Sequence, residues 1–165
     1  MLPRICAEMT NSSPGQKAVL RKAIYSDKDC IYEWRNDPAT RSFFLNPNAI
    51  SKEEHDVWFS KMLNDSHAVV LIASDSDEAR IGVIRFDIDK KESVAEISIY
   101  VDPRIVGRGW GKAILAAGIA WIRENQLVHR LRARVIPRNV ASVKLFKKVG
   151  FEITYCAYDL DLINR

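Results

Sequence analysis

The pattern of apolar and polar residues changes period several times along the chain, and its middle part has the periods of β-strands. Ala68 to Ala73 is a continuous apolar run bounded by turn-forming residues, and Arg80 to Asp87 alternates apolar with polar residues. Together they predict a β-hairpin. A second hairpin should turn near residues 89–92 and return along Val94 to Val101, with Pro103 ending the strand.

The returning strand of the second hairpin should have two different faces. Side chains alternate across a strand, so its polar and apolar residues separate. The polar face carries Glu96, Ser98 and Tyr100, and the apolar face carries Ala95, Ile97, Ile99 and Val101. Glu96 is therefore a carboxylate among apolar sequence neighbours, on a strand that leads into a turn.

Two capping patterns predict where the first helices begin. Ser26 with Asp29 resembles a capping box, and the helix over residues 30–35 should end before Asp37-Pro38. Ser51 and Glu54 form a clearer capping box. Apolar residues at helical spacing follow it, namely Val57, Trp58, Met62 and Leu63. This second helix is expected to cover one face of the sheet.

The remaining segments complete a mixed α/β order. We expect strands at residues 18–25, 131–136 and within 151–162, and helices at about 109–125 and 140–149. With the hairpins, these predict a central mixed, mostly antiparallel sheet of six to seven strands flanked by about four helices. Residues 18–165 should form a single domain. Residues 1–17 contain a cluster of turn formers and no periodicity, which indicates a flexible leader.

Composition narrows the class of partner. The chain has 165 residues, 47% of them hydrophobic, and its net charge of +4 reflects 25 Lys and Arg against 21 Asp and Glu. This mild excess suits an anionic small molecule better than a nucleic acid, and no basic run resembles a nucleic-acid-binding arm. The sequence does not fix the oligomeric state, and a homodimer is compatible with it.

Cysteine usage and hydropathy indicate a cytoplasmic protein without a structural metal. Cys6, Cys30 and Cys156 are far apart, odd in number and without metal-ligand spacing. We therefore expect neither a disulfide framework nor a metal site. No apolar run approaches the roughly 20 residues that cross a bilayer, so membrane spanning is not expected.

A glycine-rich turn follows the strand that ends at Val101. It contains Gly107, Arg108, Gly109, Trp110, Gly111 and Lys112, directly before the long predicted helix. Alternate glycines and a helix start let backbone N–H groups converge on a phosphate, and the two cations add charge. A dinucleotide-binding loop would need an early βαβ unit, whereas this turn follows two hairpins. That order argues against NAD.

The turn and a second segment together resemble the GNAT acetyltransferase family. Val101-Asp102-Pro103 matches the family's strand exit, and Gly109 and Gly111 match its pyrophosphate motif, although Val106 stands where Arg or Gln is usual. About 30 residues downstream, Asn139 to Phe151 is similar to the family's Asn-x-x-Ala/Ser-x-x-Leu-Tyr-x-x-x-Gly-Phe signature. The resemblance implies a GNAT fold with acetyl-CoA as co-substrate and no metal.

The resemblance also implies roles for individual residues. Coenzyme contacts are expected from Ile99, Tyr100, Val101 and the residues Gly107 to Lys112, and Asn139 and Ser142 should lie along the pantetheine arm. The competing interpretation of Asn139 is a simple helix N-cap, and one side chain can do both. Phe146 stands where many members carry a Tyr that protonates the leaving thiolate, so that step belongs to water, to Tyr100 or to Tyr155.

Acetyl transfer to an amine requires a neutral nucleophile, since an alkylammonium has no lone pair. Several GNAT enzymes place a carboxylate base on the strand that carries Glu96, so this residue is the candidate base. The competing interpretation is a solvated residue on a half-exposed strand. A backbone N–H near Tyr100 or Val101 would polarise the acetyl carbonyl.

The acceptor is expected near Trp34, Arg35 and His55. The segments Trp34 to Pro38, Glu53-Glu54-His55 and Ala95 to Tyr100 resemble acetyltransferases of the pseudaminic-acid pathway, which acetylate a nucleotide-linked amino sugar. Trp34 would then stack on a base and Arg35 would bind a phosphate. Alternatively, Trp34 is core, Arg35 and His55 are surface residues, and Asn36 caps the helix.

Two other functions stay open from the sequence. Segments like Trp34 to Pro38 also occur in the branch that resembles ribosomal-protein N-terminal acetyltransferases, which predicts a peptide acceptor. Val106 and Phe146 both depart from the enzyme pattern, which is compatible with a non-catalytic acyl-CoA-binding sensor. Turnover of the coenzyme would exclude the sensor.

Overall fold

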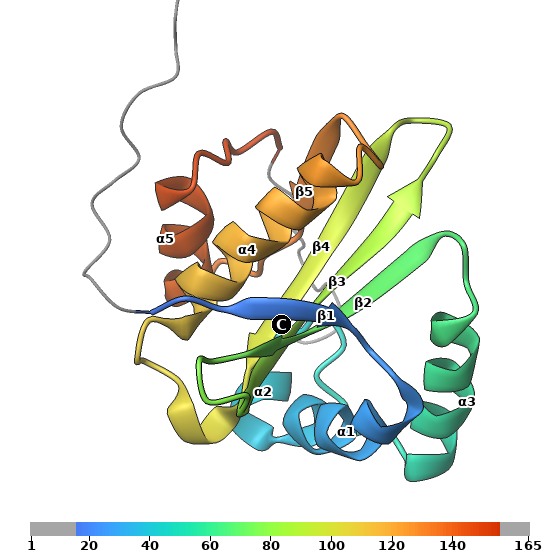
Figure 1. Ribbon diagram of the computed structural model, residues 1–165. Helices are drawn as coiled ribbons and strands as arrows, with labels where there is room; N and C mark the ends of the chain where they lie inside the picture. Colours follow the sequence, from blue (N-terminus) through green and yellow to red (C-terminus); the bar gives the residue numbers. More distant parts are fainter. Residues whose placement is uncertain (1–15, 156–165) are drawn as a thin grey trace, which may run out of the picture.

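The computed structural model describes residues 16–155, which form a twisted sheet with helices on both faces (Figure 1). The strands are β1 (Val19–Lys22), β2 (Ala68–Ser74), β3 (Arg80–Asp89), β4 (Val94–Val101) and β5 (Arg130–Ala133). They lie in sequence order across the sheet. Neighbouring strands are antiparallel from β1 to β4, and β5 is parallel to β4.

The mixed, mostly antiparallel sheet was predicted, but the predicted count of six to seven strands was too high for the described residues, which contain five. The difference lies at the C-terminal end. Residues 151–155 carry no strand, and residues 156–162 lie outside the described part of the chain. The predicted leader, residues 1–17, lies almost entirely outside it as well.

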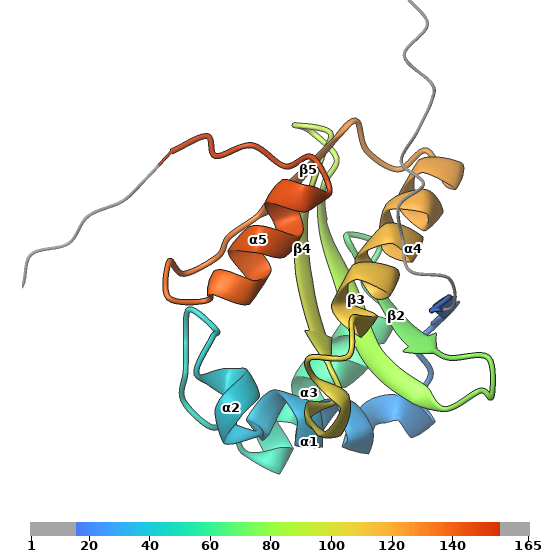
Figure 2. The same ribbon diagram turned by 90° about the vertical axis from the view of Figure 1, so that its left-hand side faces the viewer.

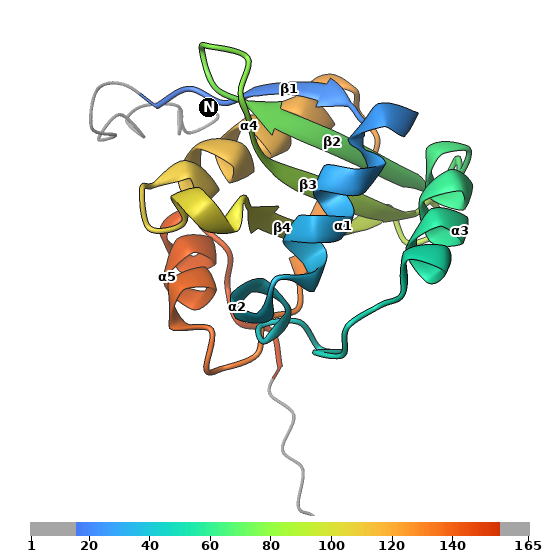
Figure 3. The same cartoon turned by 90° about the horizontal axis from the view of Figure 1, so that it is seen from below.

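The helices are α1 (Lys28–Asn36), α2 (Pro38–Arg41), α3 (Lys52–Leu63), α4 (Trp110–Glu124) and α5 (Val140–Lys148). Figure 3 shows α1 and α3 on one face of the sheet and α4 and α5 on the other. Each face has its own core. Ile31 and Phe59 pack with the sheet under α1 and α3, and Ile114, Leu115 and Phe146 pack with it under α4 and α5.

One predicted helix start is confirmed and the other is wrong. The Ser51 amide donates to the Glu54 carboxylate at 2.8 Å and the Glu54 amide donates to the Ser51 hydroxyl at 3.1 Å, so α3 begins with a capping box. Ser26 instead lies exposed in a short 3-10 turn, Tyr25–Asp27. The buried Asp27 carboxylate, which accepts from the Ile24 amide at 2.9 Å, organises that turn.

The short helix α2 was not predicted, because Asp37-Pro38 was interpreted as a helix end. Asp37-Pro38 both ends α1 and starts α2. The Asp37 carboxylate accepts hydrogen bonds from the amides of Ala39 and Thr40, and Pro38 occupies the first turn, where its missing N–H costs nothing. The loop after α2 lies close to the segment between β5 and α5 (Figure 2), where Arg138 donates to the Ser42 carbonyl at 2.9 Å.

Candidate active site

The sheet opens between β4 and β5. Their pairing starts at Val94 with Arg130 and ends at Ile97 with Ala133, although β4 continues to Val101. The last part of β4, residues 98–101, therefore keeps β3 on one side and has no neighbouring strand among residues 16–155 on the other. Its backbone groups on that side are available to a ligand, since each residue of a strand carries one donor and one acceptor.

The register of β3 and β4 shows which amides face the opening. The Asp102 amide donates to the Ile81 carbonyl at 2.9 Å, toward β3. Hydrogen-bonded and non-hydrogen-bonded positions alternate in an antiparallel pair. The amides of Ile99 and Val101 therefore point away from β3, into the opening, whereas that of Tyr100 points toward β3. Of the two expected positions for an oxyanion donor, Val101 has the suitable direction.

The glycine-rich turn lies at the end of β4 and starts α4. Gly107 and Gly109 adopt φ angles of 84° and 87°, a conformation that L side chains rarely take, and Gly109 is the N-cap of α4. The first amides of a helix have no partners within it and carry the positive end of its dipole. The turn thus has the geometry expected of a phosphate site.

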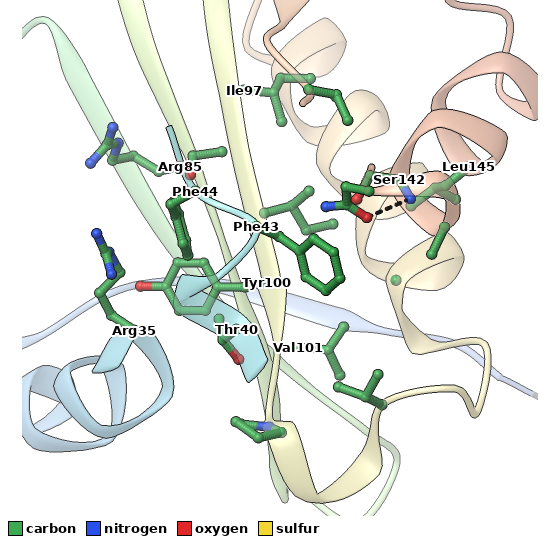
Figure 4. Close-up of a pocket in the computed structure, with 18 of the residues that line it drawn as sticks. Arg35, Thr40, Phe43, Phe44, Arg85, Ile97, Tyr100, Val101, Ser142 and Leu145 are labelled. Atoms are coloured by element: carbon green, nitrogen blue, oxygen red, sulfur yellow. Dashed lines mark hydrogen bonds between the residues drawn. The ribbon is translucent and has the colours of Figure 1, made fainter. Parts of the chain in front are cut away.

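A pocket of about 910 Å³ joins this turn to the strand opening and to the loop after α2 (Figure 4). At the turn it is lined by the predicted residues Ile99, Tyr100, Val101, Gly107, Gly109, Trp110, Gly111, Lys112, Asn139, Ser142 and Phe146. Further along it meets Glu96, Arg35 and His55. Fourteen of the sixteen predicted site residues, Arg108 and Trp34 excepted, thus line one continuous space.

Arg108 and Trp34 lie elsewhere. Arg108 is exposed in the turn but does not line the pocket. Trp34 is 4% exposed and borders a separate hollow with Arg21 and Arg80. Because α1 points Trp34 and Arg35 in different directions, only Arg35 reaches the pocket. The structure favours the interpretation of Trp34 as a core residue over its predicted stacking on a ligand.

Helix α5 contributes a wall of the pocket. The Asn139 carboxamide oxygen accepts from the Ser142 amide at 3.1 Å, so Asn139 is the N-cap of α5. Phe146 is 7% exposed and packs edge to face on Phe151, with 5.0 Å between the ring centroids. Its side chain therefore serves packing as well as lining.

The Glu96 carboxylate is held by Arg134, which follows β5. The Nε and Nη2 atoms of Arg134 lie 2.7 Å and 2.6 Å from Glu96 Oε1. This hydrogen bond, with the charge of the carboxylate, raises the pKa of the Arg134 guanidinium. Both residues line the pocket, so the pair orients the carboxylate at the strand opening. Sequence reasoning missed Arg134, for which only its position after the strand gave a signal.

Side chains from the segment Trp34 to Pro38 hold the loop after α2, which lines the end of the pocket away from the glycine-rich turn. The Asn36 side chain exchanges two hydrogen bonds with the backbone of Ile50, at 2.8 Å and 2.9 Å, and so latches the loop rather than capping α1. Arg35 Nη2 donates to the Asn46 carbonyl at 2.9 Å, and Arg41 donates to the Pro47 carbonyl at 3.1 Å. The loop carries Phe43 and Phe44, pocket residues that sequence reasoning also missed.

His55 is 1% exposed, so its interpretation as a surface residue is wrong. Its Nε2 lies 3.0 Å from the Lys28 carbonyl, and its ring lies among Tyr32, Trp58 and Phe59. Burial lowers the pKa of His55. A neutral imidazole with one ring nitrogen tied to the backbone supports the pocket wall.

The two tyrosines considered as proton donors differ in position. Tyr155 is exposed and does not line the pocket. Tyr100 lines it, but burial raises the pKa of its hydroxyl well above the ordinary value, which makes it a weaker acid. Figure 4 shows its hydroxyl on the side of Arg35 and Arg85, away from Ser142 and Leu145.

Comparison with known proteins agrees with this geometry. The family described as acetyltransferase (GNAT) domain matches residues 17–152. The chain belongs to the GNAT acetyltransferase family. Its fold is that of the spermidine N-acetyltransferase from Vibrio cholerae in complex with CoA and spermine, with a TM-score of 0.74 and 20% identity over 81% of this chain and 80% of that one.

The chain spans different shares of two curated relatives. An uncharacterized protein of Methanocaldococcus jannaschii is 24% identical over 143 residues, which are 84% of this chain but 28% of that protein. An uncharacterized N-acetyltransferase, p20, of Bacillus licheniformis is 25% identical over 83% of this chain and 80% of its own length.

No helix within residues 16–155 is long and apolar enough to span a bilayer.

Proposed function

We propose that the protein is an acetyl-CoA-dependent N-acetyltransferase for a small-molecule primary amine. The observation that carries this proposal is the single pocket that joins the glycine-rich turn of α4 to Glu96 across the open edge of β4. A coenzyme bound along this edge and an amine entering from the loop after α2 would meet at the strand opening.

The residues at the turn fit the phosphates of the coenzyme. Gly111 has ordinary backbone angles, and a Cβ there would make only van der Waals contact with Leu145 at 3.5 Å, so its lack of a side chain keeps the approach to the helix start open. Lys112 adds a cation to the lining. With Val106 where Arg or Gln is usual, we assign phosphate binding to the amides of Gly107 to Lys112 and to the Lys112 side chain, because Arg108 does not line the pocket.

The chemistry assigned to the site is a balanced acyl transfer. Acetyl-CoA supplies an acetyl thioester, whose C–S bond breaks as the C–N bond to the amine forms. Glu96 accepts the proton of the amine, directly or through one water, and the Val101 amide donates to the carbonyl oxygen as negative charge develops on it. Phe146 has no proton to give, so the thiolate takes its proton from water.

The acceptor that we propose is the amino group of a nucleotide-linked amino sugar. The resemblance of the segments around Arg35, His55 and Glu96 supports this choice, and the pocket offers the aromatic rings of Phe43, Phe44 and Trp58 to a sugar or base. Asn139 and Ser142 are assigned to the coenzyme arm, and Arg35 to the acceptor. Trp34 has no ligand role in this proposal.

A screen of acetyl-CoA consumption tests the proposal, with release of free thiol as the readout. UDP-linked amino sugars, N-terminal peptides and polyamines are compared at equal concentration. We expect turnover with an amino sugar nucleotide well above that with the peptides. Turnover with peptides alone would instead favour a protein N-terminal acetyltransferase, and coenzyme binding without turnover would favour a sensor.

A further inference from the structure

The pocket carries more positive than negative side chains. Its charged lining residues are Arg35, Arg85, Lys112 and Arg134 against Glu54 and Glu96. Lys112 belongs to the coenzyme end, at the start of α4. The other five charged residues surround the space between β4 and the loop after α2, in which an acceptor would bind.

Most of these charges already have partners within the protein. Arg134 pairs with Glu96, and Arg85 pairs with Asp87 at 2.7 Å. Glu54 uses its carboxylate in the capping box of α3. Arg35 is different, because within residues 16–155 it makes no ion pair.

The surroundings of Arg35 leave its charge uncompensated. Its Nη2 donates to a neutral backbone carbonyl, and its Nη1 is buried with no hydrogen-bond partner among the described residues. The guanidinium carbon lies 4.2 Å from the centre of the Phe44 ring, which fixes the plane of the group. Burial, together with the charges of Arg41 and Arg85, lowers the pKa of Arg35. A buried N–H donor without an acceptor destabilises the folded protein, and a ligand oxygen that accepts from it would remove this cost.

We infer that Arg35, with Arg85 beside it, forms an anion-binding subsite that selects acceptor amines carrying a phosphate or a carboxylate. Figure 4 shows the two guanidinium groups on the same side of Tyr100, each from a different element. A planar guanidinium binds either anion through its N–H donors, and Nη1 of Arg35 has no partner among the described residues. The inference rests on the proposed acetyl transfer and names the class of its acceptor.

The subsite also predicts which amines are rejected. A polyamine would bring further positive charges next to Arg35 and Arg85, and like charges brought together at a desolvated site repel each other. Spermidine should therefore be a poor acceptor for this chain, although the Vibrio cholerae protein of the same fold is named for it.

The chain offers a matched pair of variants to test this role. Arg35 and Arg41 each donate to a carbonyl of the same loop, but only Arg35 lines the pocket. Arg35→Gln and Arg41→Gln thus each remove one hydrogen bond to the loop, while only Arg35→Gln also removes the contact with Phe44 and the proposed subsite. Acetyl transfer is measured with glucosamine 6-phosphate against glucosamine, and with an amino acid against its amide.

We expect the parent to prefer the anionic member of at least one pair. Arg35→Gln should raise the KM for that acceptor roughly 10- to 100-fold more than the KM for the neutral member, the effect of one charged hydrogen bond. Arg41→Gln should keep the preference. The pair that shows the preference identifies phosphate or carboxylate as the group bound. An unchanged preference in Arg35→Gln, or equal loss in Arg41→Gln, would overturn the inference.

Binding measurements separate failure of the subsite from failure of the proposed reaction. Calorimetry with UDP, with inorganic phosphate and with acetate, in the presence of saturating CoA, needs no turnover. At least one of these anions should bind the parent and Arg41→Gln, and bind Arg35→Gln at least 10-fold more weakly. Equal binding by all three proteins, or binding of no anion by the parent, overturns the subsite, whereas loss confined to Arg35→Gln supports it even if no amine is acetylated.

Discussion

The Glu96 carboxylate and the Arg134 guanidinium, 2.6 Å apart, span the point at which β4 and β5 separate. Glu96 lies on the last residues of β4 that pair with β5, and Arg134 directly follows the end of β5. The ion pair therefore fixes a carboxylate beside the open edge whose Ile99 and Val101 amides face the pocket. This geometry places the proposed base and the proposed oxyanion donor on the same strand.

Glu96→Gln should lower turnover by about 10²- to 10⁴-fold at neutral pH, because it keeps the shape of the side chain and removes the base. Affinity for acetyl-CoA should barely change. Raising the pH should partly restore turnover, since the free amine then loses its proton in solution. Steady-state kinetics across the pH range provide the measurement.

Arg134→Met is the matched control for this substitution. It breaks the same ion pair but leaves the carboxylate, so it should retain most of the activity that Glu96→Gln loses. If both variants lost activity equally, the pair would be needed for structure only. If Glu96→Gln turned over like the parent at every pH, Glu96 would be a solvated strand residue.

The coenzyme turn gives a second prediction, and the two glycines in it are not equivalent as probes. Gly109 has φ at 87° and a Cβ there would lie 2.9 Å from the Gln16 side chain, so any side chain strains the turn. Gly111 has room for a Cβ. Gly111→Glu should therefore abolish acetyl-CoA binding in a folded protein, because it puts a carboxylate at the proposed phosphate site.

Calorimetry with acetyl-CoA measures the effect, and Gly111→Ala is the control. The alanine variant should unfold at nearly the parent temperature and bind the coenzyme much better than the glutamate variant. Gly109→Ala should cost about 1–3 kcal/mol of stability through its backbone angle. Parent-like affinity in a folded Gly111→Glu would show that the phosphates bind elsewhere.

Whether the sequence predicts a structural feature depends on how far apart in the chain the residues that form it lie. The capping box of Ser51 and Glu54 and the two hairpins are set by residues close together in the chain, and these predictions hold. The partner of Glu96 lies 38 residues away, after a helix and a strand, and no local pattern indicates it. Arg134 becomes visible only when β5 is placed beside β4.

The segment Trp34 to Pro38 shows the same limit at shorter range. The helical periodicity of the segment does not indicate that Trp34 packs in the core while Arg35 lines the pocket. Asn36 finds its partner Ile50 14 residues later, so its role as a latch depends on how the loop folds back. Asp37-Pro38 carries signals for both a helix end and a helix start, but only the helix end was predicted from the sequence.

Phe146 provides a third prediction. The ring is buried and packs on Phe151, while one side lines the pocket, so it contributes packing and no proton. Phe146→Tyr should leave kcat nearly unchanged or raise it, because the added hydroxyl could protonate the thiolate. Phe146→Ala, by contrast, should lower the free energy of unfolding by about 3–5 kcal/mol. A loss of several orders of magnitude in a folded Phe146→Tyr would contradict the placement of α5 along the coenzyme.

The last prediction concerns Asp27, a fully buried residue that does not line the pocket. Arg21 donates to both of its oxygens, at 2.6 Å and 2.7 Å, and Arg80 lies 3.1 Å away. Burial alone would raise the pKa of Asp27, but the hydrogen bonds from Arg21 and the Ile24 amide, with the charges of Arg21 and Arg80, outweigh it and hold the pKa below the ordinary value.

A carboxyl whose pKa is lower in the folded than in the unfolded state adds stability above its unfolded pKa of about 3.9. That stability is lost as the pH falls through the lower folded pKa. Asp27→Asn should therefore lower the free energy of unfolding by about 1–3 kcal/mol at pH 7, and its deficit should shrink as the pH falls below about 4. Denaturant unfolding of parent and variant between pH 7 and pH 3 measures the difference. A deficit that stayed constant over this range would mean that Asp27 has the same pKa in both states, and that the pair with Arg21 contributes only its shape.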